Sequence, residues 1–510
     1  MRDGTWVLDG DEEWLDDPFR RRAAQQRALS WCNPNGAITL PVLIRLAATA
    51  LVLTRGYVRW WFKTRMRRQE RRRCAAEEFR IGAERLGATW IKLGQLIAAG
   101  EGIFPAELVA ECRKLHDRVR AEPLRSVEKT LSRSFGQNWH QYLRIEPQPL
   151  AAASIAQTHV AYLAGGERVV VKVQRRGVAK RVERDLRALS RVAPHLVGRL
   201  PIAALANPPA LIDVFARCVG EELDFQIEAA NACDVARVVA KFGSGGVVVP
   251  RPHPIHVATE AMVLEYLPGR RLEEVGDGAL GGRVIDTLAA MVLEGALLGG
   301  VFHGDLHPGN MAVTGDSTVV LYDFGIVARL EEPERRAFLG LVLGGATGNW
   351  RQQLEALIGL GALPTDGDIE VLGRELELDR GPLDPTKLSP EDLSQEMARL
   401  ARVLLDAGAR LPKPLMLWGK NLAFLDAAVG SLCPERDLVE LIATALGEFA
   451  QRHGTRIAGE VAGGFRIDRE ALATALAAEG GSLRWSEMRE RRSMIVERQG
   501  RARRRQGSSD

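Results

Sequence analysis

Two short segments near the middle of the chain hold side chains suited to phosphoryl transfer. Residues 303–310 read His-Gly-Asp-Leu-His-Pro-Gly-Asn, and residues 321–325 read Leu-Tyr-Asp-Phe-Gly. This chemistry needs a carboxylate that orients or deprotonates the attacking group, and an Asn with a second carboxylate that holds Mg²⁺ on the phosphates. Asp305, Asn310 and Asp323 fit those roles in the expected order and spacing. Isolated turns would explain each residue alone but not the ordered set.

A hairpin upstream of these segments would present a lysine to the phosphates of ATP. Residues 154–160 and 168–173 read as two strands around a turn at 164–167. Lys172 lies on the second strand, where a buried lysine can reach the α and β phosphates.

A buried lysine of this kind needs a carboxylate partner that offsets the desolvation of its charge. Glu222, Asp224 and Glu228 are the candidates. Asp224 and Glu228 are four residues apart and share a face of the expected helix, whereas Glu222 lies on another side unless the helix starts later. Glu228 is therefore the preferred partner.

The remaining nucleotide-binding residues are expected at the start of the hairpin and beside a linker. Residues 150–157 read Leu-Ala-Ala-Ala-Ser-Ile-Ala-Gln where a protein kinase has a glycine-rich loop. Alanine resists positive φ and carries a Cβ, so the phosphates should be held differently. Simple packing at a strand start is the alternative. The expected nucleotide-binding set is Ala151, Ala152, Ala153, Ser154, Lys172, Glu265 and Leu267, the last two preceding a linker at Pro268–Gly269.

The elements that must position these residues form an α+β, bilobal, protein-kinase-like fold. Apolar spacing predicts helices before and between the strands, and further strands before the linker. The predicted helices span 75–134, 181–200, 211–242, 284–300, 331–343, 346–360 and 397–411; the further strands span 247–249 and 261–265. The expected domains are an N-terminal region (1–74), a helical extension (75–145), a small lobe (146–268), a helical large lobe (269–440) and a helical C-terminal region (441–510).

Composition predicts a globular protein that stays in the cytoplasm. The chain has 510 residues, 46% of them hydrophobic and 26% charged, and a net charge of +4 that implies no field for nucleic acids. Its six cysteines include no CxxC pair, which favours reduced thiols without a metal site. No signal peptide is recognised, and residues 37–62 are too interrupted by Arg and Pro to predict a membrane-spanning helix.

Two basic segments leave a peripheral membrane contact open. Residues 55–73 hold nine Lys and Arg against one Glu, with Tyr57, Trp60, Trp61 and Phe62 at their start. This pattern suits an interfacial anchor, or equally a surface helix whose arginines are solvated. For the arginine-rich tail at 484–505, a solvated or disordered end is preferred to lipid binding.

A helical motif that ordinary protein kinases lack indicates which family the chain resembles. Residues 86–95 contain Lys92-Leu93-Gly94-Gln95, and together with the alanine-rich stretch, Glu222-Leu223-Asp224 and the catalytic segments they resemble the UbiB/AarF family of atypical kinases over about 84–329. The family includes mitochondrial proteins that support coenzyme Q synthesis. The resemblance implies that Lys92, Gly94 and Gln95 lie on a helix that folds over the nucleotide site and contacts Glu222 and Asp224.

The same resemblance implies that proteins are not the substrate, because that helix fills the groove where a peptide would lie. Gly304 also replaces the loop arginine that docks a phosphorylated activation segment, and a helix at 331–343 follows too soon for such a segment. The chain departs from the family at Ala156, at Thr158 and at residues 98–102, which leaves its subfamily undefined.

Three functions remain open from the sequence. The first is an ATP- and Mg²⁺-dependent atypical kinase or ATPase that supports isoprenoid quinone or other membrane-lipid metabolism, with quinone-biosynthesis proteins as partners. The second is a small-molecule phosphotransferase of the aminoglycoside or choline kinase type, whose catalytic loop also matches residues 303–310. The third is a nucleotide-binding scaffold without turnover. No catalytic motif is recognised in residues 345–510.

Overall fold

A computed structural model describes the chain from residue 14 to residue 486 with gaps, and divides it into two compact units. The described residues are 14, 18–36, 39–62, 68–98, 104–115, 120–196, 208–242, 245–276, 278–315, 317–375, 409, 412–436, 438–462, 469–478 and 486. Unit 1 holds residues 1–234, 249–268 and 322–326, and unit 2 holds the rest. The chain passes between the units at Pro268–Gly269, among other points.

The centre of unit 1 is an antiparallel sheet in the order β1-β2-β3-β6-β5. Its strands are β1 (Leu143–Ala152), β2 (Ala156–Leu163), β3 (Arg168–Gln174), β6 (Ala261–Glu265) and β5 (Pro252–Val257). The predicted hairpin is confirmed as β2–β3. The sequence analysis did not predict β1, which precedes the hairpin, or β5. β3 has neighbours on both sides, with Thr158 and Met262 opposite Lys172. One face of the sheet packs against α6 (Leu124–Phe135), through buried Val127 and Leu131.

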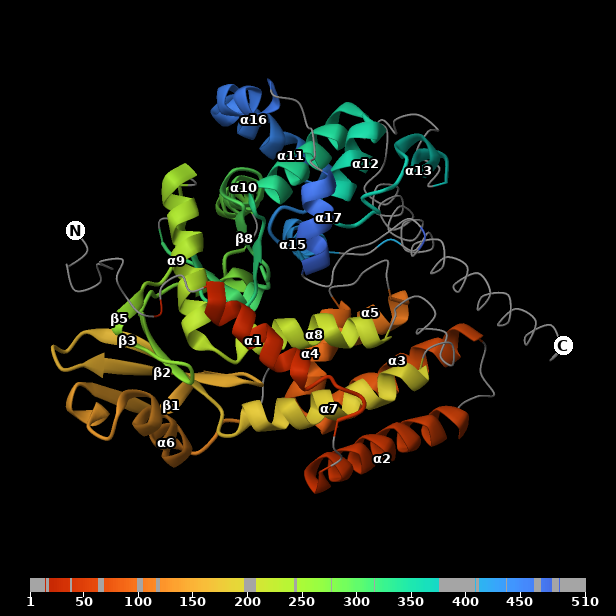
Figure 1. Ribbon diagram of the computed structural model, residues 1–510. Coiled ribbons are helices and arrows are strands. Elements are labelled where there is room, and N and C mark those ends of the chain that lie inside the picture. Colours follow the sequence, from red (N-terminus) through yellow and green to blue (C-terminus); the bar gives the residue numbers. More distant parts are fainter. Residues whose placement is uncertain are drawn as a thin grey trace, which may run out of the picture. The chain divides into compact units, whose positions relative to one another are not determined.

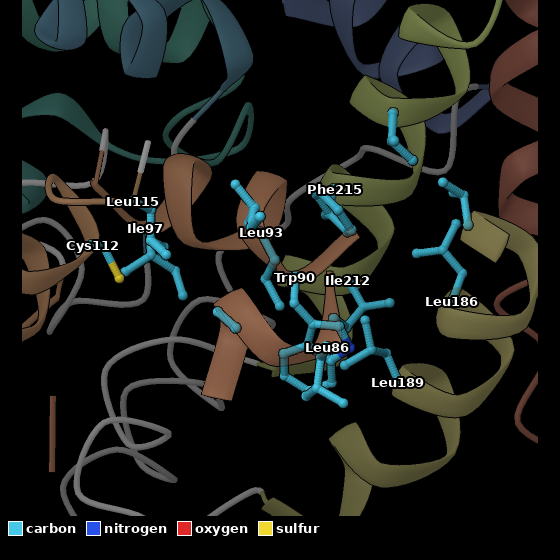
Figure 2. Packing of buried hydrophobic residues seen from close by; sticks show 14 of the residues in the cluster. Leu86, Trp90, Leu93, Ile97, Cys112, Leu115, Leu186, Leu189, Ile212 and Phe215 are labelled. Atoms are coloured by element: carbon cyan, nitrogen blue, oxygen red, sulfur yellow. The ribbon is translucent and has the colours of Figure 1, made fainter. Parts of the chain in front are cut away.

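A helical layer makes up the remainder of unit 1 (Figure 1). It consists of α1 (Pro18–Ser30), α2 (Leu40–Phe62), α3 (Arg68–Leu86), α4 (Ala88–Ala98), α5 (Ala106–Cys112), α7 (Val178–Leu196) and α8 (Pro208–Glu222). The predicted helical extension is confirmed as α3 and α4 rather than as one helix, because Gly87 adopts φ +94° between them. Figure 2 shows Trp90 of α4 packed with Leu86, Leu189 and Ile212 in one buried cluster.

The predicted helix at 211–242 is wrong in one respect, since it is interrupted. α8 ends at Glu222, and α9 (Phe225–Phe242) begins three residues later. Asp224 causes the restart, because its carboxylate accepts a hydrogen bond from the Gln226 amide at 3.1 Å, as a residue before a helix does. The side chains of Glu222 and Asp224 consequently leave two different helix ends.

Unit 2 combines two small sheets with a set of helices. β4 (Val247–Val248), β10 (Val319–Leu321), β9 (Met311–Val313) and β7 (Arg270–Arg271) form one sheet in that order, and β8 (Val301–His303) pairs with β11 (Val327–Arg329) in the other. The described helices are α10 (Ala279–Glu294), which continues as a π-turn over Gly295–Gly299, α11 (Glu332–Thr347), α12 (Trp350–Gly359), α13 (Ile369–Glu375), α15 (Lys413–Leu432), α16 (Leu438–Ala462) and α17 (Arg469–Ala478).

Several helix predictions in unit 2 can be compared with these bounds. The helix at 284–300 is confirmed as α10 and its π-turn, which ends at left-handed Gly300, and the helix at 331–343 is confirmed as α11. A single helix at 346–360 is wrong, because Gly348, at φ +66°, separates α11 from α12. Apart from Ala409 and Ser486, the predictions at 397–411 and 484–505 lie outside the described residues.

Candidate active site

Lys172 lies between two carboxylates of unit 1. Its Nζ is 2.5 Å from Oε1 of Glu228 and 3.3 Å from Oδ2 of Asp323. β3 carries the lysine in the middle of the sheet, the first turn of α9 carries Glu228, and Asp323 follows β10 in the chain. The structure thus pairs Lys172 with the glutamate that the sequence preferred, and adds the aspartate of the Asp-Phe-Gly segment.

Burial controls the charges of this cluster. Burial by itself would lower the pKa of Lys172, but the neighbouring Asp323 and Glu228 outweigh it and raise that pKa above its ordinary value. Burial raises the pKa of Glu228 to about 7, although Lys172 opposes the shift. Lys172 therefore stays protonated at neutral pH. Asp323 is more open, with 45% of its side chain exposed, compared with 4% for Glu228.

Asp323 is held by its own turn. Its Oδ1 accepts the Gly325 amide at 2.9 Å, and the preceding Tyr322 donates its hydroxyl to the Leu267 carbonyl at 2.9 Å. The backbone carbonyl of Phe324 accepts a hydrogen bond from Asn231 of α9 at 2.8 Å. Hydrogen bonds thus connect the Asp-Phe-Gly segment and the preceding tyrosine to α9 and to Leu267, which follows β6.

The break between α8 and α9 forms a second charged cluster. Lys92 of α4 pairs with Glu222 at 2.9 Å, with 17% and 11% of their side chains exposed. Glu222 also lies beside Gly325, where an added Cβ would be 3.6 Å from its Cγ. Asp224 is buried, which raises its pKa, and Arg20 of α1 lies 3.8 Å away. Lys92, Glu222 and the Asp-Phe-Gly glycine therefore belong to one contiguous region.

The rest of the Lys92 motif is explained by packing. Gly94 is buried on α4, and a Cβ there would be 2.1 Å from Cδ1 of Leu115. Figure 2 shows Leu115 and Cys112 beside the Leu93 to Ile97 stretch of α4. Gln95 is half-buried on the same helix.

The alanine-rich stretch is a tight turn between β1 and β2. Ala151 and Ala152 end β1, while Ala153 and Ser154 form the turn. The Ala153 amide closes the turn by donating a hydrogen bond to the Ala156 carbonyl at 2.8 Å. The carbonyl of Ala153 accepts a hydrogen bond from the buried Arg175 guanidinium at 2.7 Å. A side chain that follows β3 directly thus fixes the turn.

The two residues predicted beside the linker lie at the end of β6 and just after it. Glu265 ends β6 opposite Val169, and its carboxylate pairs with Arg251 at 3.2 Å. Leu267 offers its carbonyl to Tyr322, as described above. Of the predicted set in unit 1, the structure brings Lys172, Glu228 and Asp323 into direct contact, and pairs Lys92 with Glu222.

The segment 303–310 forms a compact loop in unit 2. The amide of Asp305 donates to Nδ1 of His303 at 3.1 Å, and the Asn310 side chain donates to the Asp305 carbonyl at 3.1 Å. His307 caps the short 3₁₀ turn Pro308–Asn310 by accepting the Gly309 amide at 3.0 Å. Asp305 and Asn310 are therefore fixed relative to one another by a hydrogen bond from the Asn310 side chain to the Asp305 backbone.

The sequence reasoning missed the contribution of α15 to this loop. Lys420 pairs with Oδ1 of Asp305 at 2.8 Å, and the fully buried Asn421 donates to the His303 carbonyl at 2.6 Å. The expectation that residues 345–510 lack a catalytic motif thus overlooked two contacts to the catalytic loop. The available signal was a Lys-Asn pair inside an otherwise apolar helix, Leu-Trp-Gly-Lys-Asn-Leu-Ala-Phe.

Comparisons with known proteins bear on this arrangement. The ABC1 atypical kinase-like domain family matches residues 114–357. The chain is 32% identical to the uncharacterized protein Rv0647c of Mycobacterium tuberculosis, over 78% of this chain and 83% of that protein. It is 29% identical to Activity of BC1 complex kinase 7, a chloroplastic protein of Arabidopsis thaliana, over 90% of this chain and 66% of that protein. It is 26% identical to the probable protein kinase UbiB of Sodalis glossinidius, over 72% of this chain and 69% of that protein.

The chain belongs to the UbiB/AarF family of atypical kinases. The expected α+β, protein-kinase-like fold with helical N- and C-terminal segments is confirmed. In this UbiB/AarF protein, the family match includes Lys172, Glu228, Asp305 and Asp323. Lys92 and Lys420 lie outside it, on opposite sides in the chain.

Proposed function

We propose that this protein binds ATP with Mg²⁺ and transfers or hydrolyses its γ-phosphoryl group in support of membrane-lipid metabolism. The observation that carries the proposal is the buried lysine Lys172 between Glu228 and Asp323. A lysine held by one buried carboxylate and facing a second, more exposed one is arranged for phosphate and metal rather than for stability alone.

The proposal gives each side chain a separate task. Lys172 binds the α and β phosphates, and Glu228 holds its rotamer. Asp305 orients the acceptor and takes its proton. Asn310 and Asp323 supply oxygen ligands of the hard type that Mg²⁺ prefers, and a bound ion would neutralise charge on the phosphates. The alanine turn at 151–154 and the residues Glu265 and Leu267 would contact the nucleotide.

An exposed apolar stripe on α2 supports a membrane-surface location. Leu40, Leu43, Ile44, Leu51 and Val58 are 42–71% exposed and recur at helical spacing on one face. Val42 and Thr49, on the opposite face, are buried. α2 contains no acidic residue, and the basic run at 55–73 overlaps its end, so an anionic lipid surface matches the helix in both polarity and charge.

Other findings limit how this contact can be made. Among the described residues, no helix is both long and apolar enough to cross a membrane. The side chains from Trp60 to Phe62, predicted as part of the anchor, lie outside the described residues. The proposal is therefore a helix that lies in the lipid interface. The link to isoprenoid quinones and to quinone-biosynthesis proteins rests on family membership alone.

The first experiment is Mg²⁺-dependent ATP hydrolysis by the purified protein, with and without vesicles that contain anionic lipid. We expect vesicles to stimulate hydrolysis in the wild type and not in Asp305→Asn or Lys172→Ala. Phosphorylation of choline or an aminoglycoside in a soluble assay would replace the proposal by a small-molecule phosphotransferase. Nucleotide binding without hydrolysis in any condition would replace it by a scaffold.

A vesicle sedimentation assay tests the membrane part separately. The double variant Leu43→Glu/Ile44→Glu should lose binding to anionic vesicles, because it places two charges on the apolar stripe. Ile255→Glu is the matched control, since Ile255 is 79% exposed on β5, away from this helix. Equal sedimentation of the double variant and the control would exclude α2 as the membrane contact.

A further inference from the structure

One face of α15 makes three contacts with the catalytic loop of unit 2. Lys420 reaches Asp305, Asn421 reaches the His303 carbonyl, and Phe424 meets the His307 ring edge-on at 5.6 Å between centroids. Lys420 and Asn421 are adjacent and lie four and three residues before Phe424, so the three side chains share one side of the helix. The helix lies more than 100 positions after the loop in the chain.

The loop itself contains no permanent positive charge. Residues 303–310 include neither Lys nor Arg, and the two histidines are committed to local hydrogen bonds. Nδ1 of His303 accepts the Asp305 amide, and Nδ1 of His307 accepts the Gly309 amide, so each ring is engaged as an acceptor. A reaction that gathers phosphate charge next to Asp305 needs a cation from elsewhere.

Lys420 supplies that cation in a restrained form. Its side chain is 13% exposed and that of Asp305 is 27% exposed, so their 2.8 Å contact is only partly screened by water. The Lys420 ammonium also lies 5.5 Å from the ring centroid of Phe424, within the range of a cation–π contact. The ammonium is thus held by two contacts, one with the carboxylate and one with the ring.

Asn421 explains why α15 cannot shift along the loop. It is fully buried and donates to the backbone carbonyl of His303, two residues before Asp305. Its Oδ1 has no hydrogen-bond partner among the described residues, a cost that only a specific position would justify. The neighbouring lysine is consequently aimed at Asp305 by a fixed anchor.

We propose that Lys420 is a positioning residue that directs the Asp305 carboxylate at the phosphoryl acceptor. The inference rests on the proposed function. In the step concerned, the acceptor oxygen bonds to the γ-phosphorus, the bond from that phosphorus to the bridging oxygen breaks, and ADP leaves with the electron pair. The acceptor proton passes to Asp305, which must therefore be ionised beforehand.

The kinetic test compares Lys420→Met with Lys413→Met, the same change seven residues earlier on the same helix. We expect Lys420→Met to lower kcat of ATP hydrolysis by about 100-fold, with KM for ATP changed less than about threefold, because the lysine acts on the acceptor side. Lys413→Met should resemble the wild type, and Lys420→Arg should recover part of kcat. Wild-type kcat in Lys420→Met would overturn the proposal and leave the proposed function standing.

A second readout does not depend on turnover. Crystal structures of the wild type, Lys420→Met and Lys413→Met show the orientation of the Asp305 carboxylate directly. We expect this carboxylate to leave its wild-type rotamer in Lys420→Met and to keep it in Lys413→Met, because Lys420 pairs with its Oδ1. An unchanged Asp305 rotamer in Lys420→Met would overturn the proposal even if the wild type hydrolyses no ATP.

Discussion

The two charged clusters, one in each unit, both pair a lysine with an aspartate, but they do so in different surroundings. In unit 1, Lys172 faces Asp323 and the buried Glu228, so one cation balances two carboxylates. In unit 2, Lys420 faces Asp305 at 2.8 Å, and the side chains of the two residues are 13% and 27% exposed. The first cluster thus has two carboxylates for one cation, whereas the second pairs one carboxylate with one cation.

This difference indicates different tasks. A surplus carboxylate beside a buried lysine is costly unless phosphate and a metal ion complete the charges, which favours a ligand site at Lys172. A matched pair needs no further charge, which favours a site at Asp305 that is ready before the substrate arrives. The predictions below test this contrast, beginning with the largest effect.

Lys172→Met should have the largest effect, because it leaves Glu228 and Asp323 without their cation and the phosphates without a partner. We expect MgATP affinity to fall by about 100-fold or more, a loss of roughly 3 kcal/mol, measured by calorimetry. Lys180→Met, at an exposed position on α7, is the matched control. Comparable affinities in the two variants would remove Lys172 from the nucleotide site.

Glu228→Gln should change how stability depends on pH. Burial raises the folded-state pKa of Glu228 to about 7, so its stabilising contribution is complete below its unfolded pKa and is lost as pH rises through about 7. The free energy of unfolding of the wild type, relative to Glu228→Gln, should therefore fall between pH 4.5 and 7.5, by on the order of 2 kcal/mol. Urea unfolding across this range measures it. A constant difference, like that expected for exposed Glu273→Gln, would contradict the assigned burial.

Asn421→Ala tests the anchor of the second pair. The substitution removes the hydrogen bond between the Asn421 side chain and the His303 carbonyl and also removes the Oδ1 that has no partner among the described residues, so we expect a loss of about 1–2 kcal/mol. Thermal unfolding should report this as a melting temperature lower by a few degrees. If the variant melts as the wild type does, α15 is not held at this point.

Ala153→Gly should have the smallest effect. It loosens the turn that Arg175 fixes, and a glycine there allows the backbone to approach phosphate. We expect the ratio of ATP to ADP affinity to change by roughly threefold, with little change in stability. Ala164→Gly, in the exposed β2–β3 turn, is the control for general loosening. Identical ATP and ADP affinities relative to the wild type would rule out a nucleotide contact at the turn.

Particular residues show where prediction from sequence succeeded in this protein. The hairpin that carries Lys172 was predicted from two strand-like runs, at 154–160 and 168–173, on either side of the turn at 164–167. Glu228 was chosen because it lies one helical turn after Asp224. The choice was correct although the predicted helix was not, since α9 begins at Phe225 instead of continuing from α8. A helix face is a local property, so it is retained when only the start of the helix moves.

The sequence by itself therefore determined the ordered segments at 303–310 and 321–325, the strand that carries Lys172 and the family motif around Lys92, because each of these is a pattern within a few consecutive residues. Only the tertiary structure decided that Asp323 is the second carboxylate at Lys172, that Glu222 pairs with Lys92, and that Lys420 pairs with Asp305. Each of these contacts joins segments far apart in the chain. Their pairing depends on how buried helices pack, and no local pattern of residue types records which charges that packing brings together.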